Sequence, residues 1–169
     1  VDALAAAHAR GVEVVLVSSG AIATGMPYLQ LDARPSDLAT QQAAAAVGQN
    51  VLIYRYQESL RRYSIVAGQV LLTAGDLENP THRSNAQRAM ERLLKLRILP
   101  IVNENDTVAT HEIRFGDNDR LAALVAHLVR ADAMVLLSDV DGLYTAHPET
   151  PGAEKLTLVE DIAELAVDT

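Results

Sequence analysis

Four runs of apolar, largely β-branched residues are spaced along the chain, and they indicate buried strands. Within each run nearly every position is hydrophobic, which is typical of strands in a parallel sheet that is covered on both faces. The runs occupy residues 12–17, 65–73, 98–102 and 133–137. Pro100 has no backbone N–H to donate, which predicts that it stands at the start of its strand or on an edge strand.

Between these runs, apolar residues recur with helical spacing. In residues 118–130, the apolar positions follow the i, i+3, i+4, i+7 pattern of a helix with one buried face. Gly11 is a plausible residue to end a first helix. Further helices are expected over residues 36–63, 83–96 and 158–168. Strands that alternate with helices predict βαβ units, and therefore an α/β fold with an open sheet.

Each predicted strand is followed directly by polar residues. The four polar tails read SSG, TAGD, NEND and SDVDG. The carboxyl ends of parallel strands share one edge of the sheet, and ligands of open α/β sheets bind in the crevice at that edge. We therefore expect a ligand site there, built from several of the tails.

Composition and charge limit the classes of function. The chain has 169 residues, a formal net charge of -8 and no cysteine. The acidic balance argues against nucleic-acid binding through phosphate contacts, and the lack of cysteine excludes disulfides and thiolate metal sites. No apolar stretch is long enough to span a membrane, and no signal-peptide pattern is present. We expect a soluble, cytoplasmic domain.

The first polar tail continues as a glycine-rich segment, SSGAIATGMP. Gly20 and Gly25 have the spacing of a P-loop, but Met26 and Pro27 stand where a Walker A motif requires lysine and serine or threonine. A glycine-rich turn between a strand and a helix can still present backbone N–H groups to an anion. A tight turn stabilised by serine side chains explains this segment alone equally well.

Carboxylates and amides are concentrated in IVNENDTVATHEIRFGDND, residues 101–119. The spacing does not match an EF-hand loop, so no metal site is predicted. Asp117, Asn118 and Asp119 directly precede or begin a predicted helix, where capping is the simplest role. Because one residue suffices for a cap, the alternative is that the other side chains point toward a ligand.

The remaining titratable residues give no pattern of their own. The five histidines are scattered without metal-ligand spacing and are interpreted as surface or core residues. Arg61, Arg62 and Arg83 are interpreted as helix-surface charge.

Several motifs follow one another along residues 12–148 in the order found in a known enzyme family. They are VLVSSGAIATG, QQAAAAVGQ, GQVLLT, NAQRAMERLL, PIVNENDTVAT with EIRFGDNDRLAALVA, and LLSDVDGLYTAHP. This string resembles the glutamate 5-kinases of the amino acid kinase family, and the pairing of NEND with GDND is its most specific part. The resemblance implies the three-layer αβα, open and mainly parallel sheet of the amino acid kinase, or carbamate kinase-like, fold.

The resemblance also implies an activity. Members of the family transfer the γ-phosphoryl group of ATP, with Mg²⁺, to the side-chain carboxylate of L-glutamate in the first step of proline biosynthesis. Such a transfer depends on alignment, charge neutralisation and exclusion of water. The resemblance further implies feedback inhibition by proline and a homo-oligomer of two or four chains.

Site residues carry over only at matching positions. Glutamate binding is implied for Ser19, Asp106 and Asn118, with Asp106 on the ammonium group and Ser19 and Asn118 as neutral donors to carboxylate oxygens. Their neighbours Gly20, Asn103 and Asp117 are expected to help. The implied catalytic residue is Asp119, which matches an aspartate that orients the catalytic lysines. The nucleotide side is expected at Ser138, Asp139, Gly142 and Tyr144.

Two lysine motifs of the family have no counterpart in these residues. A Lys-x-Gly strand is expected before Val1, and a glycine-rich segment with a second catalytic lysine is expected after Thr169. The chain has lysine only at Lys95 and Lys155. We therefore expect residues 1–169 to form a single, incomplete amino acid kinase domain without a PUA domain. Alone it should have little activity, because the missing cations would stabilise the transition state.

Other functions stay open at this stage. The chain could be the kinase half of a bifunctional pyrroline-5-carboxylate synthase, or another amino acid kinase. It could also be a non-catalytic module that binds glutamate or proline. A purely structural α/β domain is the least favoured alternative, because the motif string is specific.

Overall fold

The computed structural model describes residues 1–109 and 118–160. The chain divides into two compact units, Val1–Met134 and Val135–Thr169. The expectation that residues 1–169 belong to one incomplete kinase domain is not tested by this division and stays a prediction.

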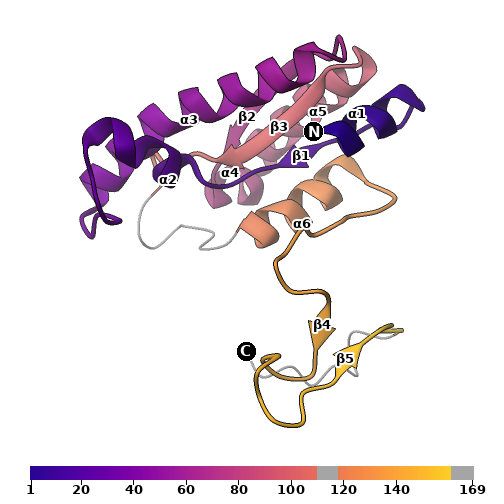
Figure 1. Cartoon of the computed structure of the whole chain (residues 1–169). Helices are drawn as coiled ribbons and strands as arrows, with labels where there is room; N and C mark the ends of the chain where they lie inside the picture. Colours follow the sequence, from indigo (N-terminus) through magenta and orange to yellow (C-terminus); the bar gives the residue numbers. More distant parts are fainter. Residues whose placement is uncertain (110–117, 161–169) are drawn as a thin grey trace. The chain divides into compact units, whose positions relative to one another are not determined.

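The first unit contains a parallel sheet of three strands in the order β1-β3-β2 (Figure 1). The central strand β3 (Leu99–Glu104) pairs along its whole length with β2 (Ala67–Leu72), whereas β1 (Leu16–Val17) pairs only with Ile101 and Val102. Pro100 is the second residue of β3 and precedes the paired part of β1. The prediction that it stands at the start of a strand is therefore confirmed, and the edge-strand alternative is wrong.

Helices cover both faces of this sheet, and Figure 1 shows α3 and α6 on opposite sides of it. The helices α1 (Asp2–Ala9) and α3 (Leu38–Arg61) cover one face. The other face is covered by α4 (Ala74–Glu78), α5 (Pro80–Lys95) and α6 (Asn118–Val129). The predicted three-layer α/β architecture with a mainly parallel sheet is confirmed.

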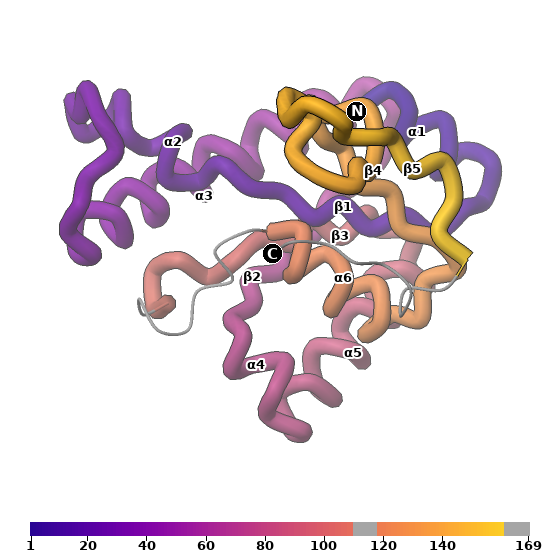
Figure 2. Tube along the Cα trace, turned by 90° about the horizontal axis from the view of Figure 1, so that it is seen from below, coloured from indigo at the N-terminus to yellow at the C-terminus, as the bar shows by residue number. Residues whose placement is uncertain are grey.

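Side chains of β3 point alternately to the two faces of the sheet and therefore contribute to two hydrophobic cores. Successive residues of a strand point to opposite faces, so Leu99 and Ile101 meet one layer of helices and Val102 meets the other. The core under α1 and α3 consists of Ala5, Ile53, Leu60, Ile65, Ala67, Leu99 and Ile101. The core under α4, α5 and α6 consists of Leu72, Leu77, Met90, Val102, Leu121, Val125 and Leu128. On that face, α5 and α6 lie side by side (Figure 2).

The short helix α2 (Ala21–Gly25), followed by the 3-10 helix η1 (Met26–Leu29), lies against α3 with the two backbones in direct contact. A Cβ atom at Gly48 would lie 1.8 Å from the carbonyl oxygen of Ala21, and one at Gly25 would lie 1.9 Å from that of Ala44. Only glycine allows backbones to approach so closely. The position of α2 is therefore fixed by the backbone of α3.

The helices α1, α3, α5 and α6 end in the same type of turn, with one residue in the left-handed conformation. In α1 this residue is Gly11, whose N–H donates to His8 O at 3.0 Å, while Val12 N–H donates to Ala7 O at 3.3 Å. This is a Schellman motif, and the prediction that Gly11 ends the helix is confirmed. The other three helices use Ser64, Arg97 and Arg130, although a side chain in this conformation costs about 1 kcal/mol.

The second unit contains a short antiparallel pair of strands, β4 (Leu143–Tyr144) and β5 (Lys155–Leu156). Tyr144 Oη donates to Asp141 Oδ1 at 2.8 Å, and Lys155 Nζ lies 2.9 Å from Asp141 Oδ2. Strands of two residues are too short to leave a periodic pattern, which explains why the sequence did not predict them.

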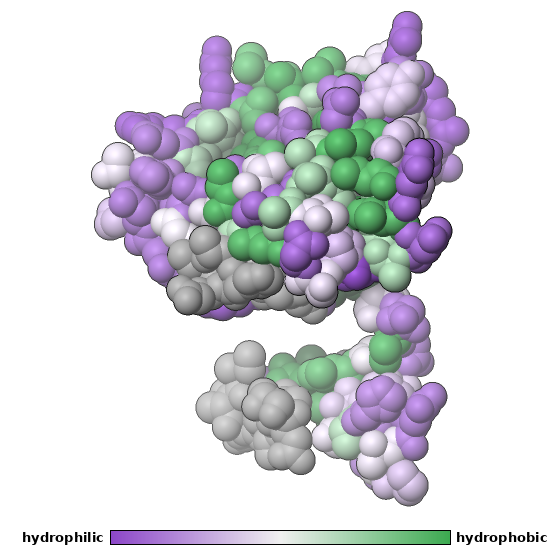
Figure 3. Space-filling model, turned by 90° about the vertical axis from the view of Figure 1, so that its left-hand side faces the viewer, coloured by the Kyte–Doolittle hydropathy of each residue, from purple (hydrophilic) through white to green (hydrophobic). Residues whose placement is uncertain are grey.

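The strand predicted over residues 133–137 is wrong, because this segment has no strand partner in the described parts of the chain. An apolar run cannot specify the strand with which it pairs. Val135 is 78% exposed and Leu137 is 87% exposed, and Figure 3 shows apolar atoms, coloured green, on the surface of both units. The helix expected over residues 158–168 is not present at residues 158–160, and its remainder lies outside the described residues.

Candidate functional site

Asn103 is at the centre of a buried group of hydrogen-bonded amides near the carboxyl end of β3. Its side chain is 1% exposed. Asn103 Nδ2 donates to Gln49 Oε1 of α3 at 2.7 Å. Asn103 Oδ1 accepts from Asn118 Nδ2 and from the N–H of Glu104, each at 2.9 Å. Donor and acceptor are both engaged, as the burial of an amide requires. We call Ser18, Gln49, Asn103 and Asn118 the amide cluster.

Asn118 connects β1 to this cluster. It is the first residue of α6, and its Nδ2 donates to the carbonyl oxygen of Ser18 as well as to Asn103. Ser18 is itself fixed, because its N–H donates to Val102 O at 2.8 Å and its Oγ shares a hydrogen bond of 3.2 Å with Tyr56 Oη. The Asn118 amide group therefore makes a tertiary contact, and an interpretation of Asn118 as a cap alone is wrong.

Ser19 and Gly20 form the connection from β1 to α2, and both are exposed. Gly20 has a φ of 90° and directly precedes the first residue of α2. Its carbonyl oxygen accepts from Thr24 N–H at 2.9 Å. The predicted glycine-rich turn between strand and helix is confirmed, while the approach of an anion to it stays a prediction.

Asp106 lines a small cavity between α2, α3 and the segment that follows β3. The lining residues are Ala21, Ala45, Gln49, Leu71, Glu104, Asn105, Asp106 and Thr107. Asp106 is half-buried, and Gln49, which supports Asn103, borders the same space. The cavity and the amide cluster therefore share one side chain and lie at the same edge of the sheet.

The structure thus brings most of the predicted substrate residues to the carboxyl ends of β1 and β3. These residues are Ser19, Gly20, Asn103, Asp106 and Asn118. Asp119 follows Asn118 in the first turn of α6 and is exposed. Asp117 lies outside the described residues. The functional roles of all these side chains stay predictions.

The residues predicted for the nucleotide side belong to the second unit and are held by short-range contacts. Ser138 Oγ accepts from the N–H of Val140 at 3.2 Å, and Asp139 Oδ1 accepts from Ser138 Oγ at 3.4 Å. A Cβ atom at Gly142 would lie 2.6 Å from Lys155 Cε, so the lysine side chain passes directly over this glycine. The hydrogen bond from Lys155, which is the larger cause, and the hydrogen bond from Tyr144 lower the pKa of Asp141.

Sequence reasoning missed the residues that support the amide cluster. These residues lie on α3: Gln49 is 8% exposed, and Tyr56 contacts Ser18, a residue of the predicted SSG tail. A signal was present, because Gln41 and Gln49 interrupt an alanine-rich helix and both are buried. A polar side chain on an apolar helix face indicates a buried hydrogen bond.

Two general properties complete the description of the site. Over residues 1–109 and 118–160, no three or more histidines, aspartates or glutamates gather in a way that could hold a metal ion. In the same part of the chain, no helix has both the length and the apolar character needed to cross a membrane.

Comparison with known proteins identifies the family. The model of the amino acid kinase family matches residues 1–168. The glutamate 5-kinase of Leifsonia xyli subsp. xyli is 81% identical over 159 residues, which are 94% of this chain and 59% of that protein. The glutamate 5-kinase of Streptomyces coelicolor is 60% identical over 166 residues, or 98% of this chain and 44% of the relative.

A third relative, the glutamate 5-kinase of Cutibacterium acnes, is 59% identical over 169 residues, which are 100% of this chain and 43% of the relative. The chain therefore spans between 43% and 59% of the length of these three curated relatives. A parallel sheet between two layers of helices agrees with the family match. Because that match extends over residues 1–168, the chain belongs to the amino acid kinase family.

Proposed function

We propose that the protein phosphorylates the side-chain carboxylate of L-glutamate with ATP, which gives L-glutamate 5-phosphate in the first step of proline biosynthesis. The observation that carries this proposal is the amide cluster, which holds the start of α6 against the ends of β1 and β3. Relatives of this chain that are named glutamate 5-kinases support the choice of substrate.

Each residue at this edge has a role that follows from its chemistry. The carboxylate of Asp106 pairs with the ammonium group of glutamate in a half-buried position, where a charged hydrogen bond is strong. Ser19, on the exposed turn after β1, donates its hydroxyl proton to a substrate carboxylate. Asn118 Nδ2 already donates to Ser18 O and Asn103 Oδ1. Asn118 therefore offers its Oδ1 to the ammonium group, in place of the donor role expected from the sequence.

The nucleotide side of the proposal rests on the second unit. Ser138 and Asp139 are exposed residues that carry a hydroxyl and a carboxylate, and Gly142 and Tyr144 follow in the same segment of the chain. These groups suit a nucleotide whose phosphates carry Mg²⁺, because such a metal needs only one or two protein carboxylates. When bound, Mg²⁺ neutralises phosphate charge during transfer. Asp119 acts as a positioning residue for the lysines of the complete enzyme.

The proposal includes three further points that the resemblance implies. The enzyme acts in the cytoplasm, it assembles as a homo-oligomer of two or four chains, and proline inhibits it at the glutamate site. Proline carries the same α-carboxylate and a positively charged amine, so the groups around Asp106 and Ser19 can recognise both molecules.

A kinase assay on the full-length protein that contains this chain tests the proposal. With Mg²⁺ and ATP, we expect phosphorylation of L-glutamate and none of L-aspartate or N-acetyl-L-glutamate. Turnover of either alternative in place of glutamate would contradict the substrate assignment. Binding of glutamate or proline in a calorimeter without any turnover would instead favour a non-catalytic binding module.

Substitution of Asp106 tests the site itself. Asp106→Ala should raise the KM for glutamate at least about tenfold, since a charged hydrogen bond is lost, with little change in the KM for ATP. Asp32→Ala, at an exposed carboxylate after η1, is the control and should change neither constant. An unaltered glutamate KM in Asp106→Ala would remove this residue from the substrate site.

A further inference from the structure

A second cavity, of about 540 Å³, opens between α5 and α6 in the first unit. Its lining consists of Arg83, Gln87, Ala126, His127, Leu128, Arg130 and Ala131. Leu128 is ten residues after Asn118 along α6, which places the cavity about 15 Å from the amide cluster along the helix axis. It is therefore separate from the candidate glutamate site.

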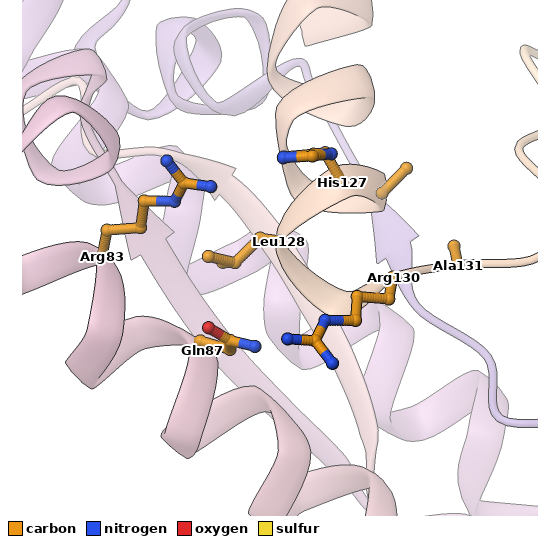
Figure 4. A pocket seen from close by; sticks show the side chains of 7 residues that line it. Arg83, Gln87, His127, Leu128, Arg130 and Ala131 are labelled. Carbon is orange, nitrogen blue, oxygen red and sulfur yellow. The ribbon is translucent and has the colours of Figure 1, made fainter. Parts of the chain in front are cut away.

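Positive charge is concentrated at this cavity. Figure 4 shows the guanidinium groups of Arg83 and Arg130 and the imidazole of His127 extending into the space between the two helices. No carboxylate is among the lining residues, although the chain as a whole carries a formal net charge of -8. Two arginines at one cavity create a local positive potential that attracts anions, although the Glu91 carboxylate lies next to the lining residue Gln87 on α5.

The side chains of Arg83, His127 and Arg130 have no partner within the described part of the chain. None of them takes part in an ion pair or a side-chain hydrogen bond there. Elsewhere in the first unit exposed arginines do find acceptors, as Arg62 does at Asp2 and Arg88 does at Asn85. Arg83 is an exposed residue of α5, as its interpretation as helix-surface charge predicts, and it also lines the cavity.

Arg130 and Arg97 share a backbone conformation but differ in the contacts of their side chains. Both residues adopt a left-handed conformation at the end of a helix, with φ of 54° and 58°, where glycine is favoured. Arg97 uses its side chain to donate to Gly11 O and Val12 O, each at 3.2 Å, and to His8 O, which ties α1 to α5. The Arg130 side chain makes no comparable contact with residues 1–109 or 118–160, and it lines the cavity.

The conformation of Arg130 is well defined even though glycine would suit it better. Its N–H donates to His127 O at 3.2 Å, and the next N–H, of Ala131, donates to Ala126 O at 2.9 Å. Two of the last carbonyl groups of α6, those of Ala126 and His127, are thereby satisfied within the chain.

We propose that the cavity between α5 and α6 binds a small organic oxyanion with at least two negative charges. Guanidinium groups bind phosphate and carboxylate oxygens in a bidentate manner, so both phosphorylated and polycarboxylate molecules share the required chemistry. The volume is typical of a site for a small organic ligand and exceeds the needs of a single inorganic ion. Leu128, Ala126 and Ala131 supply an apolar wall. Gln87 Nε2 donates one hydrogen to Glu91 Oε1 at 3.1 Å and retains a second N–H for a ligand. The inference does not depend on the proposed kinase activity.

Isothermal titration calorimetry of the whole chain at low ionic strength tests this inference, with pyrophosphate and citrate as probes. We expect at least one probe to bind. Tighter binding of pyrophosphate would indicate a phosphorylated ligand, and tighter binding of citrate would indicate a polycarboxylate. If neither probe binds, the inference is wrong.

Variants then locate the binding. Arg83→Gln and Arg130→Gln should each weaken the affinity by roughly tenfold, as expected for the loss of a charged hydrogen bond. Arg92→Gln is the matched control, since Arg92 is an exposed arginine of α5 outside the lining, and it should change the affinity less than about twofold. A double variant, Arg83→Gln with Arg130→Gln, that keeps its unfolding midpoint and binds the probe as tightly as the unaltered chain would overturn the inference.

Discussion

The amide cluster around Asn103 and the exposed group of Asp141, Tyr144 and Lys155 are both joined by side-chain hydrogen bonds, but the two groups differ in burial and in the sequence separation of their partners. Asn103 is 1% exposed and bonds to a glutamine 54 positions away and to an asparagine 15 positions away. Asp141 is exposed, and its partners lie 3 and 14 positions away. Buried polar contacts between distant segments depend on the packing of the whole core, whereas exposed local contacts depend mainly on the segment itself. Substitutions that disturb packing should therefore affect the first group and spare the second.

The largest effect on stability is expected from Gly48→Ala, which disrupts the contact between α2 and α3. The new Cβ atom would lie 1.8 Å from the backbone oxygen of Ala21, so α2 has to move. We expect a loss of at least about 3 kcal/mol in the free energy of unfolding, measured by urea denaturation. Gly75→Ala is the control, because the nearest atom to its new Cβ would be Thr73 Oγ1 at 3.8 Å. Equal stability of the two variants would contradict this account.

Asn103→Ala should come next, because it removes the centre of the amide cluster. Gln49 would lose its buried partner and Asn118 one of its two acceptors. Leaving buried polar groups unpaired costs about 1–3 kcal/mol, and we expect a loss of about 3 kcal/mol in the free energy of unfolding. Asn85→Ala, at an exposed position of α5, should cost less than about 0.5 kcal/mol. A small effect of Asn103→Ala would mean that the cluster contributes little to the fold.

A smaller effect, dependent on pH, is expected at Asp76, which closes the capping box of α4. Burial disfavours its charged form, but hydrogen bonds from the Thr73 side chain, the Thr73 N–H and His82 outweigh burial and lower the pKa of Asp76 below its ordinary 3.8. Because the folded pKa is depressed, the stabilisation is complete above the unfolded pKa and is lost as the pH falls through the folded pKa.

Asp76→Asn should therefore be less stable than the unaltered chain at pH 7 by about 1 kcal/mol or less. The difference should shrink as the pH falls below the ordinary value of 3.8. Urea midpoints of both proteins at neutral and acid pH measure it. A difference that stayed constant across this range would show that the charge of Asp76 is not the cause.

The smallest effect on stability is expected from Asp141→Asn in the second unit. The hydrogen bond to Asp141 raises the pKa of Tyr144 above its ordinary 10.0, so the substitution should return this pKa toward 10.0. An NMR titration of the tyrosine ring signals measures the shift. The urea midpoint should stay unchanged, because the group is exposed. A large loss of stability would contradict the proposed independence of the local contacts from the core.

Features that depend on neighbouring residues, such as the buried face of a helix or the residue that ends it, could be predicted from the sequence. The spacing of Leu121, Val125 and Leu128 anticipated α6, since helical periodicity records which face is buried. The apolar run at residues 133–137 looked the same as the true strands, because strand pairing is a relation between segments that a single run does not encode. The end of α1 at Gly11 was predictable, because glycine has a specific conformational advantage there.

The candidate site was predictable in part for a different reason. The resemblance of motifs predicted Ser19, Asp106 and Asn118 as site residues. The polar tails after the predicted strands predicted that these residues share one edge of the sheet. Gln49 and Tyr56 were missed, because their partners lie far away in the sequence. The cavity at Arg83 and Arg130 was also missed, because it exists only where α5 and α6 pack together.

The hydrogen bond between Asn118 and Ser18 joins residues that are 100 positions apart. A ribosome makes β1 and the turn at Gly20 well before it makes α6, and contacts between distant residues form only after the entropy of a long loop has been lost. The Ser18 carbonyl oxygen must therefore remain without this partner throughout the synthesis of the intervening segments. The edge proposed to hold glutamate is completed only after α6 has been made, and a nascent chain that stops short of residue 118 cannot yet form it.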